Sequence, residues 1–280
     1  MDRVRFGAVA RDGSRIASIP GFKATKDVRV KRQGAIATYG RITVFRSLTN
    51  TCQVIVQHKP LRKWLSPCTV TIIGDDTTGI APGQLWSVCA QCHPRKPSLV
   101  ELALDFNLNV GVDCPYVLRH GVFGKTRRRV DRGGPQSLRY GSRSAPKLVR
   151  CYQKNSLGAF RVELELHSAL LRKTRVTRVQ DLSLIASKLS PKHVRMVGVC
   201  WNKLEAHLQR RFGNSARAAL AETRRLRDEV SLRDAMRFLS GKGVMNPHRF
   251  LRPLRVNDQI KSALRRWAKR FYTPEELPVK

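Results

Sequence analysis

Hydrophobic and polar residues alternate along several stretches in the first two thirds of the chain. Such alternation is typical of strands, because successive side chains point to opposite faces of a sheet. With runs rich in β-branched residues, it predicts strands at residues 51–57, 69–73, 99–106, 138–143, 147–154 and 160–167. Helices are expected between them at residues 81–92 and 114–122.

After residue 168 the spacing of apolar residues changes to three and four, which is typical of amphipathic helices. A first helix is expected from Pro191, with a stripe formed by Val194, Val197, Trp201, Leu204 and Leu208. Another is expected from Asn214 or Ser215 to about Val230. Ser231 is a capping residue for a third helix that stops at Gly241, and a last helix is expected from Asp258 to Phe271.

These patterns predict an α+β protein with three regions. Residues 1–50 form a basic N-terminal segment with no assigned fold, and the first 30 or so residues are a candidate basic arm. Residues 51–170 form an antiparallel sheet, and residues 171–280 form a helical C-terminal region.

Charge changes the picture by selecting a class of partner. The chain holds 54 Lys and Arg against 20 Asp and Glu, a formal net charge of +34. A surface this positive attracts phosphates and gains free energy by releasing their counterions. Ribosomal, chromatin and membrane-surface proteins share this property. The basic clusters that we expect to contact phosphates are Arg127, Arg128 and Arg129, and Arg265, Arg266 and Lys269 of the last helix.

The seven cysteines are odd in number and scattered, which favours free thiols and a cytoplasmic location. No apolar run approaches the roughly 18 residues of a membrane span, and the N-terminus lacks the apolar run of a secretory signal. Cys89, Cys92 and His93 match a haem-attachment pattern, but haem attachment requires export. A zinc site is not favoured either, since no second ligand pair follows.

Charged side chains share one face of three expected strands. By alternation, Glu101 lies in phase with Asp105, Arg150 with Tyr152 and Lys154, and Glu163 with Glu165 and His167. Grouped carboxylates suit Mg²⁺ or Mn²⁺, and a tyrosine beside Lys or Arg can attack phosphorus. Alternation alone, however, more often marks the solvated face of an antiparallel sheet.

The segments that join these strands carry a family resemblance. Tyr140-Gly-Ser-Arg143-Ser, Arg150-Cys-Tyr152-Gln-Lys154 and Arg161-Val-Glu163 stand in order, and Glu101-Leu-Ala-Leu-Asp105 precedes them. This series resembles the replication initiation factor family, the rolling-circle initiators of filamentous phages and staphylococcal-type plasmids. The match is close over about 40 residues and looser over residues 50–170.

The resemblance implies a relaxase-like nicking domain that forms a 5′-phosphotyrosyl intermediate on DNA. It implies Tyr152 as nucleophile, with Tyr140 as the alternative, and Arg150 and Lys154 at the scissile phosphate. Glu101, Asp105 and Glu163 would bind Mg²⁺ or Mn²⁺, with Glu165 or His167 as further ligands, and Arg143 would contact DNA. Single-stranded and duplex origin DNA, a host helicase and a DNA polymerase are the implied partners; the oligomeric state, a dimer included, stays open.

Two other functions stay open. A protein with the same scaffold and an inactive site would bind DNA or RNA without cutting it. That reading is motivated by Gln153-Lys154-Asn155-Ser156, which lacks the acidic residue that the family often has there. A tyrosine recombinase would instead use Tyr272 in a helical domain, which the strand-rich setting of Tyr152 does not favour.

Overall fold

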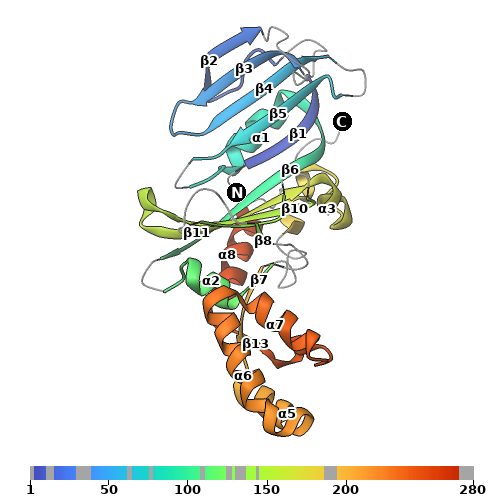
Figure 1. The fold of residues 1–280 in the computed structure, drawn as a ribbon. Coiled ribbons are helices and arrows are strands. Elements are labelled where there is room, and N and C mark those ends of the chain that lie inside the picture. The colour runs from blue at the N-terminus through green and yellow to red at the C-terminus, as the bar shows by residue number, and fades with distance from the viewer. Residues whose placement is uncertain are drawn as a thin grey trace.

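The computed structural model describes residues 3–10, 16–29, 39–61, 65–75, 78–107, 111–123, 128–129, 137–142, 145–185 and 194–270. Within these ranges the protein is α+β, with a large antiparallel sheet followed by a helical C-terminal region (Figure 1). The sheet has the strand order β2-β3-β4-β5-β1-β6-β11-β10-β9-β8.

The strands of this sheet differ widely in length, from the long β6 at its centre to a two-residue β8 at one edge. Their bounds are β1 Arg3–Ala10, β2 Phe22–Arg29, β3 Tyr39–Ser47, β4 Gln53–Pro60, β5 Cys68–Ile73, β6 Cys92–Asn107, β8 Arg128–Arg129, β9 Ser137–Tyr140, β10 Lys147–Lys154 and β11 Ala159–His167. The strands expected at 69–73, 99–106, 147–154 and 160–167 are therefore confirmed, and the one expected at 51–57 begins at Gln53.

The N-terminal residues are not a basic arm. β1 lies between β5 and β6 in the middle of the sheet, and β2 and β3 form its other edge. In β1 the burial alternates strictly, and Val4, Phe6 and Ala8 are fully buried. A central strand with one apolar face must pack on a core, which explains why the sheet extends well before residue 51.

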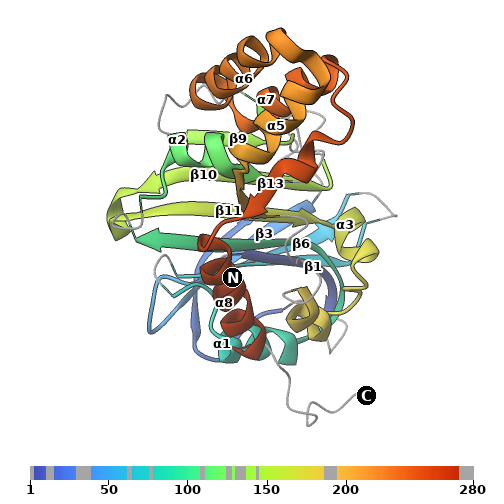
Figure 2. The ribbon, with the colours of Figure 1, turned by 90° about the horizontal axis from the view of Figure 1, so that it is seen from below.

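One face of the sheet is apolar and covered by helices. Figure 2 shows α8 (Val256–Arg270) lying across this face near α1 (Pro82–Ala90). Ile260, Leu264 and Trp267 of α8 belong to the same buried cluster as the apolar side chains of β1, β6 and β11. The remaining elements around the sheet are α2 Cys114–His120, α3 Ser168–Lys173 and the short turns at Asn155–Leu157 and Val179–Ser183.

Beyond the β9 edge the chain forms a second unit, which we call the helical lobe and define as residues 195–253 (Figure 1). It has its own apolar core, which includes Leu204, Leu220 and Leu239. Its elements, with the neighbouring β7, are β7 Gly121–Val122, β12 Arg195–Val199, α5 Trp201–Phe212, α6 Ala216–Arg225 with a π-turn at Leu226–Val230, α7 Leu232–Gly241, a turn at Pro247–Phe250 and β13 Leu251–Pro253.

The start of the first C-terminal helix was predicted wrongly. Residues 195–199 are strand β12, which pairs with β7 and β13, and the helix begins only at Trp201; Pro191 lies outside the described residues. The later predictions are confirmed: the Ser231 hydroxyl caps α7 by accepting from the Asp234 N–H at 3.2 Å, and α7 ends at Gly241. The last helix spans 256–270, and Phe271 lies outside the described residues.

Candidate functional site

The sheet brings the expected polar residues together on the face opposite the helices. In the antiparallel register Arg150 lies opposite Glu163, Tyr152 opposite Arg161, and Glu165 opposite Glu101. Directly opposed side chains of an antiparallel pair share a face. The predicted phase of β6, β10 and β11 is therefore confirmed, and we call this side of the sheet the open face.

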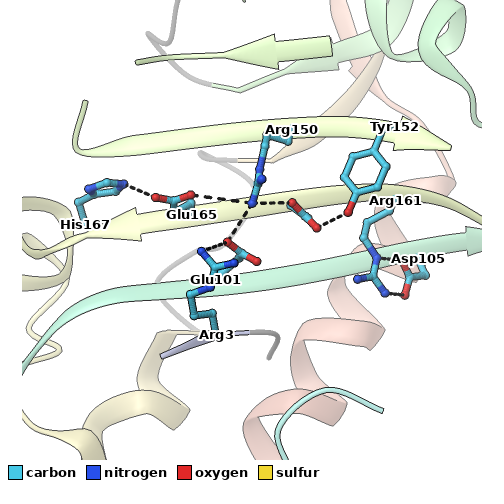
Figure 3. Close-up of polar contacts among 9 residues, drawn as sticks. Arg3, Glu101, Asp105, Arg150, Tyr152, Arg161, Glu165 and His167 are labelled. Carbon is cyan, nitrogen blue, oxygen red and sulfur yellow. Dashed lines mark hydrogen bonds and ion pairs between the residues drawn. The ribbon is translucent and has the colours of Figure 1, made fainter. Parts of the chain in front are cut away.

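A single guanidinium holds the carboxylates of the open face. Arg150 Nη2 lies 2.8 Å from Glu163 Oε2 and 3.0 Å from Glu101 Oε2, and 4.0 Å from Glu165 Oε2 (Figure 3). Glu101 and Glu163 are almost fully buried, and Arg150 is the nearest cation to both carboxylates. Burial raises the pKa of Glu101, and repulsion from Glu163 and Glu165 adds to that rise.

Tyr152 stands next to this cluster and is tied to it. Its hydroxyl donates a short hydrogen bond to Glu163 Oε1 (Figure 3). Burial raises the pKa of the Tyr152 phenol, and the hydrogen bond to Glu163 raises it further, whereas the charges of Arg161 and Arg150 oppose the shift. Tyr152 is consequently a neutral phenol at neutral pH, with a proton acceptor already in contact.

An ion pair and a histidine–carboxylate contact flank the cluster on the same face. Arg161, which is 4% exposed, donates to Asp105 Oδ1 at 2.6 Å and to Asp105 Oδ2 at 2.7 Å. At the other end, His167 Nε2 lies 2.9 Å from Glu165 Oε1. Asp105 is thus engaged by its own arginine and does not join the carboxylates around Arg150.

The expected metal ligands are of the right chemistry but in the wrong arrangement for a metal. The oxygens of Glu101 and Glu163 converge on one point, and a guanidinium nitrogen occupies it. Asp105 is paired elsewhere. Among the residues that the structure describes, no three His, Cys, Asp or Glu side chains are grouped to hold a metal ion. As they stand, these residues do not fit Mg²⁺ or Mn²⁺.

Sequence reasoning missed one member of the cluster. Arg3 of β1 lies opposite Glu101, and Arg3 Nη1 is 3.7 Å from Glu101 Oε2. The alternation of Arg3 and Arg5 with Val4 and Phe6 was the available signal. It could not reveal the partner, because the pairing of β1 with β6 joins residues nearly 100 positions apart.

The alternative nucleophile lies elsewhere. Tyr140 is 7% exposed, belongs to the apolar cluster and packs against the Phe123 ring at 4.6 Å between centroids. Leu138 and Tyr140 point to the covered face, since they alternate with the half-buried Ser137 and Arg139. Lys154, by contrast, lies two residues beyond Tyr152 at the end of β10 and shares its face.

The expected DNA-binding residues are dispersed. Arg127 and Arg143 lie outside the described residues, and Arg128 and Arg129 are placed only as the backbone of the edge strand β8. Arg265, Arg266 and Lys269 are exposed on α8. Because α8 packs its apolar side on the covered face and Tyr152 lies on the open face, these three cations lie across the sheet from Tyr152.

The thiols offer no competing site. Cys89 and Cys92 are buried thiols at the junction of α1 and β6, and burial raises the pKa of Cys89. His93 is exposed beside them. Buried, protonated thiols are poor metal or haem ligands, since the thiolate is the ligating form.

Comparison with known proteins does not assign the chain to a group. No protein-family model matches it, and no curated protein matches it either. Within the described ranges, no helix is both long and apolar enough to span a lipid bilayer.

Proposed function

We propose that the protein is a rolling-circle replication initiator, a site-specific single-strand DNA endonuclease and strand transferase with Tyr152 as nucleophile. The observation that carries this proposal is the hydrogen bond from the Tyr152 hydroxyl to Glu163 on the open face of a strongly basic protein. The phenol needs a base at hand because burial keeps its pKa high. On this proposal the sheet is a relaxase-like nicking domain.

The chemistry follows from these contacts. The Tyr152 oxygen attacks the phosphorus of a phosphodiester, while its proton passes to Glu163. The bond from phosphorus to the 3′ oxygen breaks, so Tyr152 keeps the 5′ phosphate. The departing 3′ oxygen takes a proton from solvent and becomes the 3′-OH that a host polymerase extends. Arg150 lies within reach of the negative charge that builds up on the phosphate.

The other parts of the chain have supporting roles in this proposal. Lys154, on the same face as Tyr152, is a contact for the scissile phosphate. The helical lobe and the exposed cations of α8 provide surfaces for duplex origin DNA or for a host helicase. No step is assigned to Mg²⁺ or Mn²⁺; the requirement for a divalent ion, which the resemblance implies, stays a prediction.

A covalent-adduct assay tests the proposal. The protein is incubated with single-stranded oligonucleotides from the origin of its own replicon, in Mg²⁺, in Mn²⁺ and in chelator, and adducts are resolved on a denaturing gel. Wild type and Tyr140→Phe should form an adduct, and Tyr152→Phe should form none. Each of the two substitutions removes one phenolic hydroxyl, so the pair is matched. If Tyr152→Phe forms as much adduct as wild type, Tyr152 is not the nucleophile.

One observation favours the rival function. Glu101, Glu163 and Asp105 are all ion-paired with arginines, as expected for a face that only holds strands together. A binding-only protein on the same scaffold would slow the migration of DNA on a native gel. It would yield no adduct with any origin-derived strand under any of the three ionic conditions.

A further inference from the structure

A second polar feature lies on the open face, well away from Tyr152. It is a cavity of about 830 Å³ between the end of β1, the start of β6 and the segment that follows α3. None of the described residues that line it is acidic. Its lining combines cations with hydroxyl groups, namely Arg95, Lys96, Arg178, Ser66, Thr69 and Thr177.

The cations of this cavity are available to a ligand. Arg95, Lys96 and Arg178 are exposed, and none forms an ion pair with another residue of the described ranges. The neighbouring carboxylate, Asp181, is occupied by the backbone, since it accepts from the N–H of Thr177 at 2.8 Å and of Arg178 at 2.7 Å. The charge of the cavity is therefore positive.

The floor of the cavity is built rather than incidental. Gly7 of β1 forms part of it, and a Cβ at this position would lie 2.2 Å from Ser66 Oγ. The Tyr39 hydroxyl lies 2.6 Å from Thr69 Oγ1 and donates to the Ser66 carbonyl at 3.2 Å. These contacts hold the Tyr39 and Thr69 hydroxyl groups in place in the lining that they share with the three cations.

The cavity and Tyr152 are on the same side of the sheet. Gly7 lies opposite Thr69, two residues along from the pair of Arg5 and Thr71 and four along from Arg3, which reaches Glu101. Alternate residues of a strand share a face, so β1 connects the cavity to the Arg150 cluster. From the strand rise and strand spacing, the cavity lies roughly 30 Å from Tyr152.

We propose that this cavity binds a backbone phosphate of the same DNA strand that reaches Tyr152, several nucleotides from the scissile bond. Three cations, fixed hydroxyls and a lining that holds no carboxylate among the described residues suit a phosphodiester, and such contacts set register without reading sequence. Arg5 and Arg3 stand along the path between the two sites. The inference rests on the proposed function for the identity of the strand.

Salt-dependent binding tests the cavity separately from the chemistry. The protein carries Tyr152→Phe so that DNA stays intact, and its affinity for a fluorescent oligothymidylate longer than the span is measured at several salt concentrations. Arg95→Ala with Lys96→Ala should reduce the slope of log affinity against log salt by about 0.7, the change expected for one lost phosphate contact on a single strand. Arg95 and Lys96 are both exposed, so the double variant should have the same melting temperature as its parent.

The matched control is Lys23→Ala with Arg46→Ala, which removes two exposed cations from opposed positions of β2 and β3 at the far edge of the sheet. It should leave the slope unchanged. The proposal is overturned if the cavity variant has the same slope as the parent protein, or if the control variant shows as large a reduction in slope as the cavity variant. It is also overturned if thymidine monophosphate or oligouridylate binds the cavity as tightly as the DNA strand.

The two proposals fail in different ways. In a background with Tyr152 intact, the cavity variant should still form the covalent adduct at saturating DNA, because the cavity does not touch the reacting atoms. If the cavity variant forms the adduct and its slope is unchanged, the phosphate-binding role of the cavity is refuted and the nicking function is not. A reduced slope without an adduct in any protein would refute the nicking function and leave a strand-binding cavity.

Discussion

The Tyr152 hydroxyl donates a hydrogen bond to Glu163 across neighbouring strands, and the second oxygen of Glu163 lies 2.8 Å from Arg150. One carboxylate thus joins the phenol to the guanidinium. In this arrangement Glu163 can accept the phenolic proton while Arg150 balances the charge that remains.

Replacing Glu163 tests its role as the base. Glu163→Gln keeps the shape but cannot accept the proton, so single-turnover adduct formation should slow by about 10²–10⁴-fold near pH 7. Only the phenolate can attack in this variant, and its rate should therefore rise with pH. Glu205→Gln, at an exposed position of α5, is the control and should react as wild type. A Glu163→Gln protein that reacts at the wild-type rate would exclude Glu163 as the base.

Arg150 should matter for stability as well as chemistry. Arg150→Ala takes from the buried Glu101 and Glu163 their nearest cation, and we expect a loss of about 2–3 kcal/mol in unfolding free energy, allowing for the partial exposure of Arg150. Urea unfolding at pH 7 measures this loss. The deficit should shrink in acid, because Glu101 already has a raised pKa and is neutralised as the pH falls through it. Arg46→Ala, which removes an exposed cation, should cost little; equal stability of the two variants would contradict the account.

The same substitution should expose a metal site. Without the guanidinium, the oxygens of Glu101 and Glu163 converge on an open position that suits a hard cation. Mn²⁺ should then raise the melting temperature of Arg150→Ala. The increase should be smaller in the double variant that carries both Arg150→Ala and Glu163→Gln. Wild type should show the smallest shift in differential scanning fluorimetry. A wild-type shift as large as that of Arg150→Ala would mean that the metal binds without displacing Arg150.

A buried lysine predicts a pH effect remote from the site. Lys147 donates to the Phe123 carbonyl at 2.6 Å, and burial lowers its pKa from 10.5 to about 8. Between these two values only the unfolded chain holds the proton, so this residue makes the protein more stable as pH rises from about 8 to about 10.5. The gain is about 3 kcal/mol at most. The free energy of unfolding, measured with denaturant across this pH range, should rise with pH more steeply for wild type than for Lys147→Met. Parallel plots of this free energy against pH would refute the shift.

The sequence was most informative where one strand has one clear period. Residues 160–167 alternate strictly between apolar and polar side chains, and Arg150 and Tyr152 stand two positions apart in 147–154, so the shared face of these residues could be predicted. The prediction of a helix was wrong for residues 194–199 and right from Trp201 onward. Val194, Val197 and Trp201 fit a helical spacing, yet Val197 lies in β12, a strand in which almost every position is buried, and Val194 directly precedes that strand. Periodicity cannot separate these two cases.

The features that the sequence could not predict depend on the pairing of strands far apart in the chain. Nothing in residues 3–10 indicates that they lie between β5 and β6, and so neither Arg3 beside Glu101 nor the cavity over Gly7 could be foreseen. The engagement of Asp105 by Arg161 was equally hidden, because strand phase assigns a face but not a partner.

The most direct test of the account is to identify the residue that carries DNA after reaction. Wild-type protein is reacted with an origin-derived strand, the DNA is trimmed with nuclease, and the protease-digested peptides are analysed by mass spectrometry. The account predicts a single nucleotide-modified peptide with the modification on Tyr152. A modification on Tyr140, Tyr272 or any other residue would contradict it.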